Sequence, residues 1–155
     1  MKRFQFKFQT LLNIERHKED AVKQELRTLL YNLQKEEEIL SNLRTMYLEQ
    51  QEELARKQIG QISPEELKLY EAYIFTLSNQ ITSQQVKVKE CEAEADAVRQ
   101  KLIKISKRRK MLEKLRERKK KEHEYLFQQY ENKQLDELAI TRVQRFKSAR
   151  VSLNP

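Results

Sequence analysis

Few side chains in this sequence could do chemistry by themselves, because the chain has only two histidines and one cysteine. A metal site needs three or four converging ligands. If the chain folds back on itself near its middle, His17 lies beside residue ~105 and far from His123. No ligand set then converges, and both histidines are expected at the surface. Cys91 falls on an apolar seam and is interpreted as a small buried hydrophobe. We therefore expect no metal.

Catalysis is not expected either. The single glycine excludes a glycine-rich loop that would bind phosphate. Adjacent carboxylates such as Glu36, Glu37 and Glu38 lie in a helical pattern, and a two-helix structure offers no concave site that excludes water. The sequence therefore predicts neither an enzyme nor a cofactor.

The composition favours long helices over a thick globular core. Charged residues make up 36% of the 155 residues and hydrophobic residues 38%, with one Gly, two Pro and no Trp. Ordinary domains have about 25% charged residues. Leu, Glu, Lys, Gln and Arg are abundant, and these residues favour helices. The sequence predicts either a thin apolar seam between long helices or disorder.

The cellular location follows from what the sequence lacks. A lone cysteine forms no internal disulfide, so nothing indicates an oxidising compartment. No apolar run approaches the roughly 20 residues that span a bilayer. The basic, phenylalanine-rich start lacks the apolar segment of a signal peptide. We expect a cytoplasmic protein.

Heptad periodicity decides between coiled coil and disorder. Two runs alternate steps of three and four residues without losing phase, which over more than three heptads is typical of coiled coils. Ten of fourteen positions are apolar in the first run, and eleven of twelve in the second if Cys and Ala are counted. We therefore predict an all-α fold over residues 8–105. The positions are Phe8, Leu12, Glu15, Glu19, Val22, Leu26, Leu29, Leu33, Glu36, Leu40, Leu43, Tyr47, Gln50 and Leu54, then Leu67, Tyr70, Ile74, Leu77, Ile81, Gln84, Val88, Cys91, Ala95, Val98, Leu102 and Ile105.

A strong turn signal separates the two runs. Gly60 is the only glycine and can end the first helix. Ser63 suits the N-cap of a second helix, and Pro64 suits its first position. Glu66 completes a capping box with Ser63. A connection this short makes the two helices antiparallel neighbours.

The expected architecture is one coiled-coil domain over residues 1–155, a long antiparallel hairpin whose second helix is longer than the first. Folding about residue ~61 pairs positions whose numbers add up to roughly 122. Residues 122–150 then extend beyond the first arm. The expected limits are about 5–58 for arm one, about 59–63 for the turn, about 64–147 for arm two and about 148–155 for a disordered tail.

Positive charge is concentrated in one stretch of the second arm. Residues 99–121 carry thirteen basic and two acidic side chains, a net charge of +11, whereas the whole chain is +8. Such a helix repels itself. We therefore expect residues 104–121 to bind an acidic partner rather than form only a solvated face. Nucleic acid is disfavoured because no aromatics are interleaved for base stacking, and a membrane because no bulky apolar face is present.

An aromatic-rich patch lies near the turn. Tyr73 and Phe75 fall off the seam and should be exposed, and exposed aromatic residues often anchor interfaces. One helical stripe in this patch is a candidate contact surface, and its residues are Tyr73, Leu77, Gln80 and Gln84.

Four segments together resemble the FliJ family of flagellar export proteins, in order and over nearly the whole chain. Phe4–Leu12 resembles the opening pattern F-x-F-x-L-Q-x-L-L, with Thr10 as a departure, and Tyr70–Leu77 resembles Y-x-x-F/Y-I-x-x-L. Leu112–Arg118, followed by Tyr125, resembles L-E-K-L-x-E-R…Y. Leu135–Ala139 resembles L-D-E-x-A.

This resemblance implies a non-catalytic protein of the flagellar type III protein export apparatus, and hence a role in flagellum biogenesis, motility and chemotaxis. It implies a stalk-like hairpin that enters the hexameric export ATPase and links it to the cytoplasmic domain of the export-gate membrane protein. It also implies escort of export chaperones and peripheral association with the inner face of the cell membrane at the flagellar base.

The resemblance further implies that residues 1–20 and 104–140 face the ATPase and that the patch around Tyr73 and Leu77 faces the gate. The implied ATPase-binding residues are Phe4, Phe6, Phe8, Arg108, Arg109, Lys110, Leu112, Leu115, Arg116, Arg118, Leu135, Asp136 and Glu137.

Two alternative functions fit the same pattern. One is a basic coiled-coil arm that binds structured nucleic acid, and the other is the equivalent stalk of a virulence-type secretion system. The opening phenylalanine pattern and the L-D-E-x-A ending favour the flagellar protein. We expect a monomer when free and no small-molecule substrate.

Overall fold

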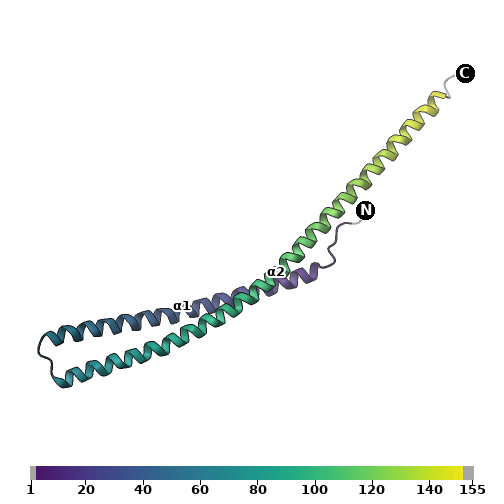
Figure 1. The fold of residues 1–155 in the computed structure, drawn as a ribbon. Helices are drawn as coiled ribbons and strands as arrows, with labels where there is room; N and C mark the ends of the chain where they lie inside the picture. Colours follow the sequence, from purple (N-terminus) through teal and green to yellow (C-terminus); the bar gives the residue numbers. More distant parts are fainter. Residues whose placement is uncertain (1–2, 152–155) are drawn as a thin grey trace. The chain divides into compact units, whose positions relative to one another are not determined.

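The computed structural model describes residues 3–151, which form two helices joined by a short turn (Figure 1). Helix α1 comprises Gln9–Ile59 and helix α2 comprises Pro64–Val151. The described residues include no strand. The predicted all-α hairpin with a longer second helix is confirmed.

The contacts within the chain divide it into two compact units. The hairpin unit comprises residues 17–106 and includes the turn. The terminal unit comprises residues 1–16 together with residues 107–155.

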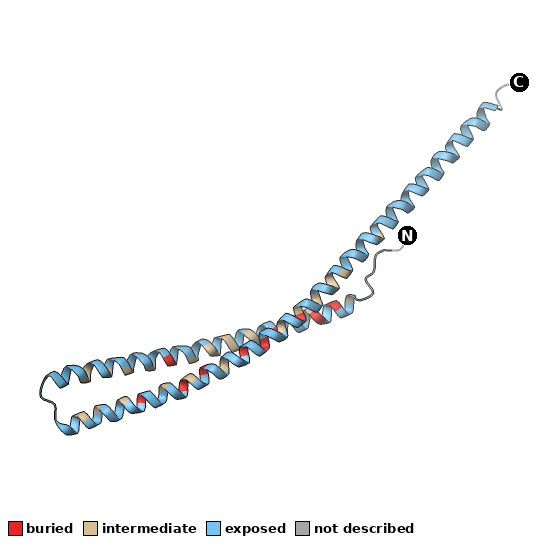
Figure 2. Cartoon of the chain, viewed as in Figure 1, coloured by how far each residue is buried: buried red, intermediate tan, exposed pale blue. Residues whose placement is uncertain are grey.

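The seam of the hairpin unit coincides with the predicted heptad positions. Every such position from Glu19 to Leu54 on α1 and from Leu67 to Ile105 on α2 is buried or half-buried (Figure 2). A cluster of buried and partly buried residues in this seam is aliphatic, as expected for a core one or two side chains wide. It joins Val22, Val98 and Ile105 to Leu26, Leu29 and Leu102.

Polar contacts across the hairpin unit fix the pairing of the two helices. The Tyr70 hydroxyl donates a hydrogen bond to Glu53 at 3.2 Å. The Gln84 side-chain amide donates to the backbone carbonyl of Glu36 at 3.0 Å. The residue numbers of these two pairs add up to 123 and 120, close to the predicted sum of roughly 122.

The turn is defined by capping of the second helix. Ser63 Oγ accepts a hydrogen bond from the Glu66 amide at 3.3 Å, as an N-cap side chain does. The Ser63 carbonyl accepts from the Leu67 amide at 3.0 Å. No described residue has a positive φ, so Gly60 follows the last residue of α1 without the left-handed conformation that often ends helices.

The first helix begins later than the sequence predicted, at Gln9 rather than near residue 5. Phe4, Phe6 and Phe8 recur every second residue, a spacing that a helix would spread over different faces. Outside the helix, the Phe4 ring instead lies 5.6 Å from the His123 ring, between centroids. Residues 3–8 therefore form a non-helical strap in the terminal unit. The Phe6 carbonyl accepts a hydrogen bond from the Gln9 amide at 3.1 Å, where the strap meets α1.

Helix α2 continues to Val151, which corrects the expectation of disorder from residue 148. The Ser148 hydroxyl donates to the Gln144 carbonyl at 2.6 Å. Arg150 places a positive charge in the last turn, where it interacts favourably with the helix dipole. The rest of the predicted tail, residues 152–155, lies outside the described residues.

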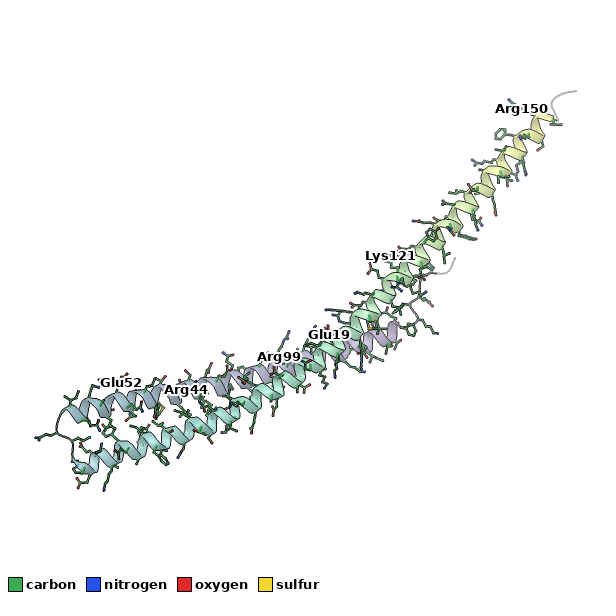
Figure 3. The ribbon with its side chains drawn as sticks, viewed as in Figure 1. Glu19, Arg44, Glu52, Arg99, Lys121 and Arg150 are labelled. Atoms are coloured by element: carbon green, nitrogen blue, oxygen red, sulfur yellow. The ribbon has the colours of Figure 1, made fainter. Side chains whose placement is uncertain are left out.

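The last part of α2 is exposed on all sides. Residues 124–151 are all exposed, and Figure 3 shows side chains projecting in every direction between the labelled Lys121 and Arg150. Over residues 3–151, no helix combines the length and apolarity needed to cross a membrane.

Candidate functional site

The terminal unit carries the dense positive charge predicted from the sequence. Residues 107–121 include ten basic and two acidic side chains, a net charge of +8. Arg108, Lys110, Arg116 and Arg118 are exposed, and none of them forms an ion pair with a described acidic residue. Their charges are available to an acidic partner, because like charges along one helix repel rather than neutralise each other.

The lysines that follow are partly neutralised within α2. Lys119 pairs with Glu122 at 2.8 Å, and Lys121 pairs with Glu117 at 3.1 Å. Ion pairs between exposed side chains contribute little to stability. The basic surface therefore centres on residues 108–118.

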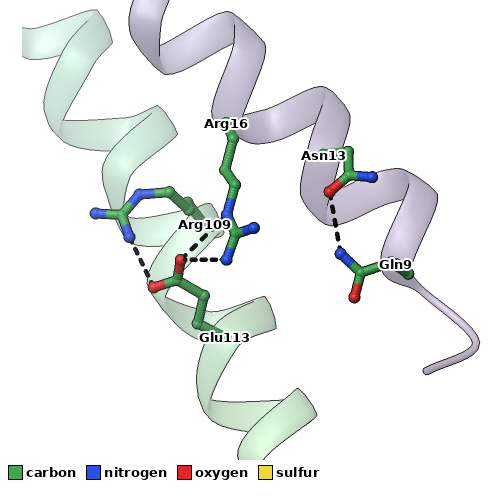
Figure 4. Close-up of polar contacts among 5 residues, drawn as sticks. All are labelled: Gln9, Asn13, Arg16, Arg109 and Glu113. Atoms are coloured by element: carbon green, nitrogen blue, oxygen red, sulfur yellow. Dashed lines mark hydrogen bonds and ion pairs between the residues drawn. The ribbon is translucent and has the colours of Figure 1, made fainter. Parts of the chain in front are cut away.

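One carboxylate ties α1 to this basic segment (Figure 4). Glu113 accepts hydrogen bonds from Arg16 of α1 at 3.1 Å and from Arg109 of α2 at 2.7 Å. Partial desolvation acts to raise the pKa of Glu113, but the hydrogen bonds and charges of Arg16 and Arg109 outweigh it and hold the pKa below its ordinary value. Of the predicted basic contacts, Arg109 is thus engaged within the chain.

Two apolar grooves flank the basic side chains. One, of about 220 Å³, is lined by Leu11, Glu15, Arg108, Met111 and Leu112. Leu11 and Met111 are exposed while Glu15 is buried. An apolar groove beside unpaired guanidinium and ammonium groups can accept a segment that is both apolar and acidic.

The second groove lies between the N-terminal strap and α2. It has a volume of about 470 Å³, and its lining includes Phe4, Lys120, His123 and Phe127. The Phe6 ring lies 5.9 Å from the Phe8 ring. The structure therefore brings the predicted Phe4 contact to α2 and places the other two phenylalanines together within the strap.

The remaining predicted ATPase contacts lie on two parts of α2. Leu112 and Leu115 are half-buried beside the basic residues. Leu135, Asp136 and Glu137 are exposed on the terminal extension of the helix.

The predicted stripe near the turn is only partly a surface. Tyr73 and Gln80 are exposed, but Leu77 is 1% exposed and Gln84 is buried. Both buried residues occupy seam positions facing α1, so they cannot contact a partner without opening the hairpin unit. The stripe of four is corrected to Tyr73 and Gln80.

A groove near the turn includes an aromatic residue that the stripe left out. It has a volume of about 510 Å³, and its lining includes Tyr47, Leu54, Ile74 and Phe75. Phe75 is 68% exposed. The sequence predicted that Phe75 is exposed, because it lies off the seam. That Phe75 shares a groove with Tyr47 and Leu54 became clear only from the register of the two helices in the structure.

A polar cluster lies at the same end of the hairpin unit. Lys57 Nζ lies 4.9 Å from the centre of the Tyr70 ring, and Tyr70 also donates to Glu53. Interaction with Tyr70 raises the pKa of Lys57. Lys57 therefore stays charged and shields one face of the Tyr70 ring.

Cys91 fits a structural role on the seam. Burial, followed by the charges of Glu36, Glu94 and Glu90, raises the pKa of the half-buried Cys91 thiol. Such a thiol is a poor nucleophile near neutral pH. Within residues 3–151, no group of three or more His, Cys, Asp or Glu side chains is arranged to hold a metal ion.

Comparison with known proteins agrees with the resemblance of the four segments. The family model described as "Flagellar FliJ protein" matches residues 4–148. No curated protein and no solved structure shows significant similarity to the sequence. Members of the matched family are non-catalytic components of flagellar export. The chain therefore belongs to the FliJ family of flagellar export proteins.

Proposed function

We propose that this chain is a non-catalytic coupling protein of the flagellar type III export apparatus, in which its terminal unit binds the hexameric export ATPase. The single observation that carries this proposal is the exposed, unpaired charge of Arg108, Lys110, Arg116 and Arg118 beside an apolar groove. The family match supports an export role for such a surface. The ATPase would contribute acidic side chains and an apolar anchor, because those groups complement this surface.

The hairpin unit would contact the cytoplasmic domain of the export-gate membrane protein near the turn. Tyr73 and Phe75 are exposed aromatic residues, and Phe75 borders the groove with Leu54. Aromatic side chains beside a groove are typical anchors of protein interfaces. The two units would thus bind different partners and couple them through the continuous helix α2.

The same protein would escort export chaperones. It would work in the cytoplasm, peripherally associated with the membrane at the flagellar base. In this role it would support motility and chemotaxis through delivery of export substrates, without catalysis of its own.

ATPase binding is tested with three charge reversals that avoid the Arg16–Glu113–Arg109 contacts. The variant is Arg108→Glu, Lys110→Glu and Arg116→Glu, and the control reverses Lys68, Lys87 and Lys89 on the same helix of the hairpin unit. We expect the variant to lose roughly tenfold or more in affinity for the purified ATPase and the control to lose less than about twofold. Equal affinities for both variants would refute this binding surface.

Gate binding is tested separately with Tyr73→Ala and Phe75→Ala, because neither side chain is buried. We expect a double variant to lose gate binding while its affinity for the ATPase is unchanged. Unchanged gate binding, with the helical content preserved, would reject the contact near the turn.

Salt dependence separates this function from nucleic-acid binding. A nucleic-acid arm would bind RNA with a log–log salt slope of about −0.7 to −0.9 per phosphate contact. We expect RNA binding to be weak and indifferent to sequence. Tight RNA binding with a steep slope, lost in the Arg108, Lys110 and Arg116 variant, would favour the alternative.

A further inference from the structure

The exposed end of α2 has opposite charges in its two halves. Residues 122–137 contain five acidic and one basic side chain, a net charge of −4. Residues 138–151 contain four basic and no acidic side chains, a net charge of +4. Because α2 is continuous through Val151, these halves follow one another along a single helix.

One face of this segment has a pattern that reads the same in both directions. The steps between its residues are four, four, three, four and four, which keep them on one side of a helix. An aromatic residue stands at each end, two leucines stand at the centre, and an acidic and a basic residue hold equivalent positions between them. The residues are Phe127, Glu131, Leu135, Leu138, Arg142 and Phe146.

The apolar members of this face are open to solvent. Leu135 is 63% exposed, Leu138 is 62% exposed and Phe146 is 76% exposed. Phe127, which also lines the groove of the strap, is 37% exposed. Large apolar side chains gathered on one exposed face indicate an interface.

We propose that this face binds the same face of a second copy of the chain, with the two helices antiparallel. A two-fold axis would pass midway between Leu135 and Leu138, so that each leucine meets the other leucine of the second copy. Phe127 would then face Phe146 of the second copy, and Glu131 would face Arg142 of the second copy. The acidic half of each helix would lie along the basic half of the other.

Charge disfavours the parallel arrangement of the same two helices. A parallel pair would place Glu131 against Glu131 and Arg142 against Arg142, with each half beside a half of its own sign. Like charges that face each other across an interface weaken association. The antiparallel pair turns every one of these contacts into an attraction.

The interface is short, so the dimer is expected to be weak. From Phe127 to Phe146 a helix rises about 29 Å at about 1.5 Å per residue. Two helices in contact over that length bury less area than a standard stable interface. We expect a dissociation constant in roughly the micromolar range and weaker association at high salt, because the charged contacts are exposed.

This inference does not depend on the proposed export function. It differs from the expectation of a free monomer, because the face from Phe127 to Phe146 is apolar at its ends and centre and is exposed in the structure. It also uses Leu135, an implied ATPase contact, so the ATPase and the second copy would compete for this segment.

Sedimentation equilibrium of the full chain measures the dimer directly. We expect the apparent mass to rise from monomer to dimer with concentration. Glu131→Arg alone and Arg142→Glu alone should each weaken association roughly tenfold or more, since each places like charges together twice in the symmetric pair. The double variant should restore association to within about threefold of the parent.

A matched control reverses a charge on another face of the same segment. Lys133 lies about 160° around the helix from Leu135 and so points away from the leucine face. Lys133→Glu should leave association unchanged. A parent chain that stays monomeric at about 100 μM, or a double variant as weak as the single ones, overturns the proposal.

Cysteine cross-linking tests the orientation. In a Cys91→Ala background, Glu124→Cys on one copy would face Ala149→Cys on the other. A mixture of the two variants should form disulfide dimers faster than either variant alone, because in the antiparallel pair identical positions lie about 38 Å apart. Preferential cross-linking of identical positions would show a parallel pair and overturn the proposal.

Discussion

Gln84 and Glu36 contact each other across the hairpin unit, and both occupy positions of a seam that is mostly apolar. The Gln84 amide donates to the Glu36 backbone carbonyl at 3.0 Å and also to the Glu36 carboxylate. A polar pair at one level of a coiled coil fixes register, since any shift would leave a buried polar group without its partner.

Removing one member of this pair should have a different effect on stability from replacing both. Gln84→Ala should lower the free energy of unfolding by about 1–3 kcal/mol, because it leaves a gap in the seam and removes the side-chain hydrogen bonds to Glu36. The double variant Glu36→Leu and Gln84→Leu should be at least as stable as the parent. Urea unfolding followed by circular dichroism measures both. A Gln84→Ala protein as stable as the parent would show that the contact is not formed in solution.

The turn offers two changes of opposite sign. Gly60→Ala should raise the free energy of unfolding by about 0.4–1 kcal/mol, because Gly60 has no positive φ and the added Cβ would meet only the Lys57 carbonyl, at 3.7 Å. Ser63→Ala should lower it by about 0.5–2 kcal/mol through loss of the N-cap. Thermal unfolding of the two variants measures both changes. A lower midpoint for Gly60→Ala than for the parent would contradict this description of the turn.

The Glu113 contacts predict a pH dependence of stability. The pKa of Glu113 is lowered in the folded protein, so its contribution is present above the ordinary value of 4.5 and is lost as the pH falls through the folded pKa. The side chains are partly exposed, so the contribution is about 0.2–1 kcal/mol. Glu113→Gln should lower stability at pH 7 and reduce the difference between pH 7 and pH 3. A variant whose pH profile parallels that of the parent would contradict the prediction.

Cys91 should react slowly with thiol reagents in the folded protein. Its raised pKa leaves little thiolate at pH 7, and the side chain is half-buried. We expect the rate of modification by a chromogenic disulfide reagent to rise severalfold or more in denaturant. Equal rates in native buffer and denaturant would show that the seam near Cys91 is open.

Periodicity made the hairpin predictable. Positions chosen only by heptad spacing, such as Val22 and Val98, are those that the structure buries. Ser63 caps α2 as its type and place before Pro64 indicated. These features depend on residues close in sequence or on one repeated pattern, which is why one sequence suffices to find them.

Other features depend on contacts between distant residues. The start of α1 shifted to Gln9 because Phe4 packs on His123, a partner that no local pattern identifies. The Phe75 groove needed the register that brings Tyr47 and Leu54 beside it. Leu77 was predicted both as a seam residue and as a surface contact, and packing against α1 settles the conflict in favour of burial.

The most direct test of the proposed coupling role is the turnover and oligomeric state of the purified export ATPase, measured with and without the full chain. Substoichiometric addition should promote hexamers and raise turnover. The Arg108, Lys110 and Arg116 charge-reversal variant should do neither, while the control with Lys68, Lys87 and Lys89 reversed should act like the parent. If the parent chain changes neither quantity and instead binds RNA with a steep salt dependence, the coupling role is contradicted and the basic segment belongs to a nucleic-acid arm.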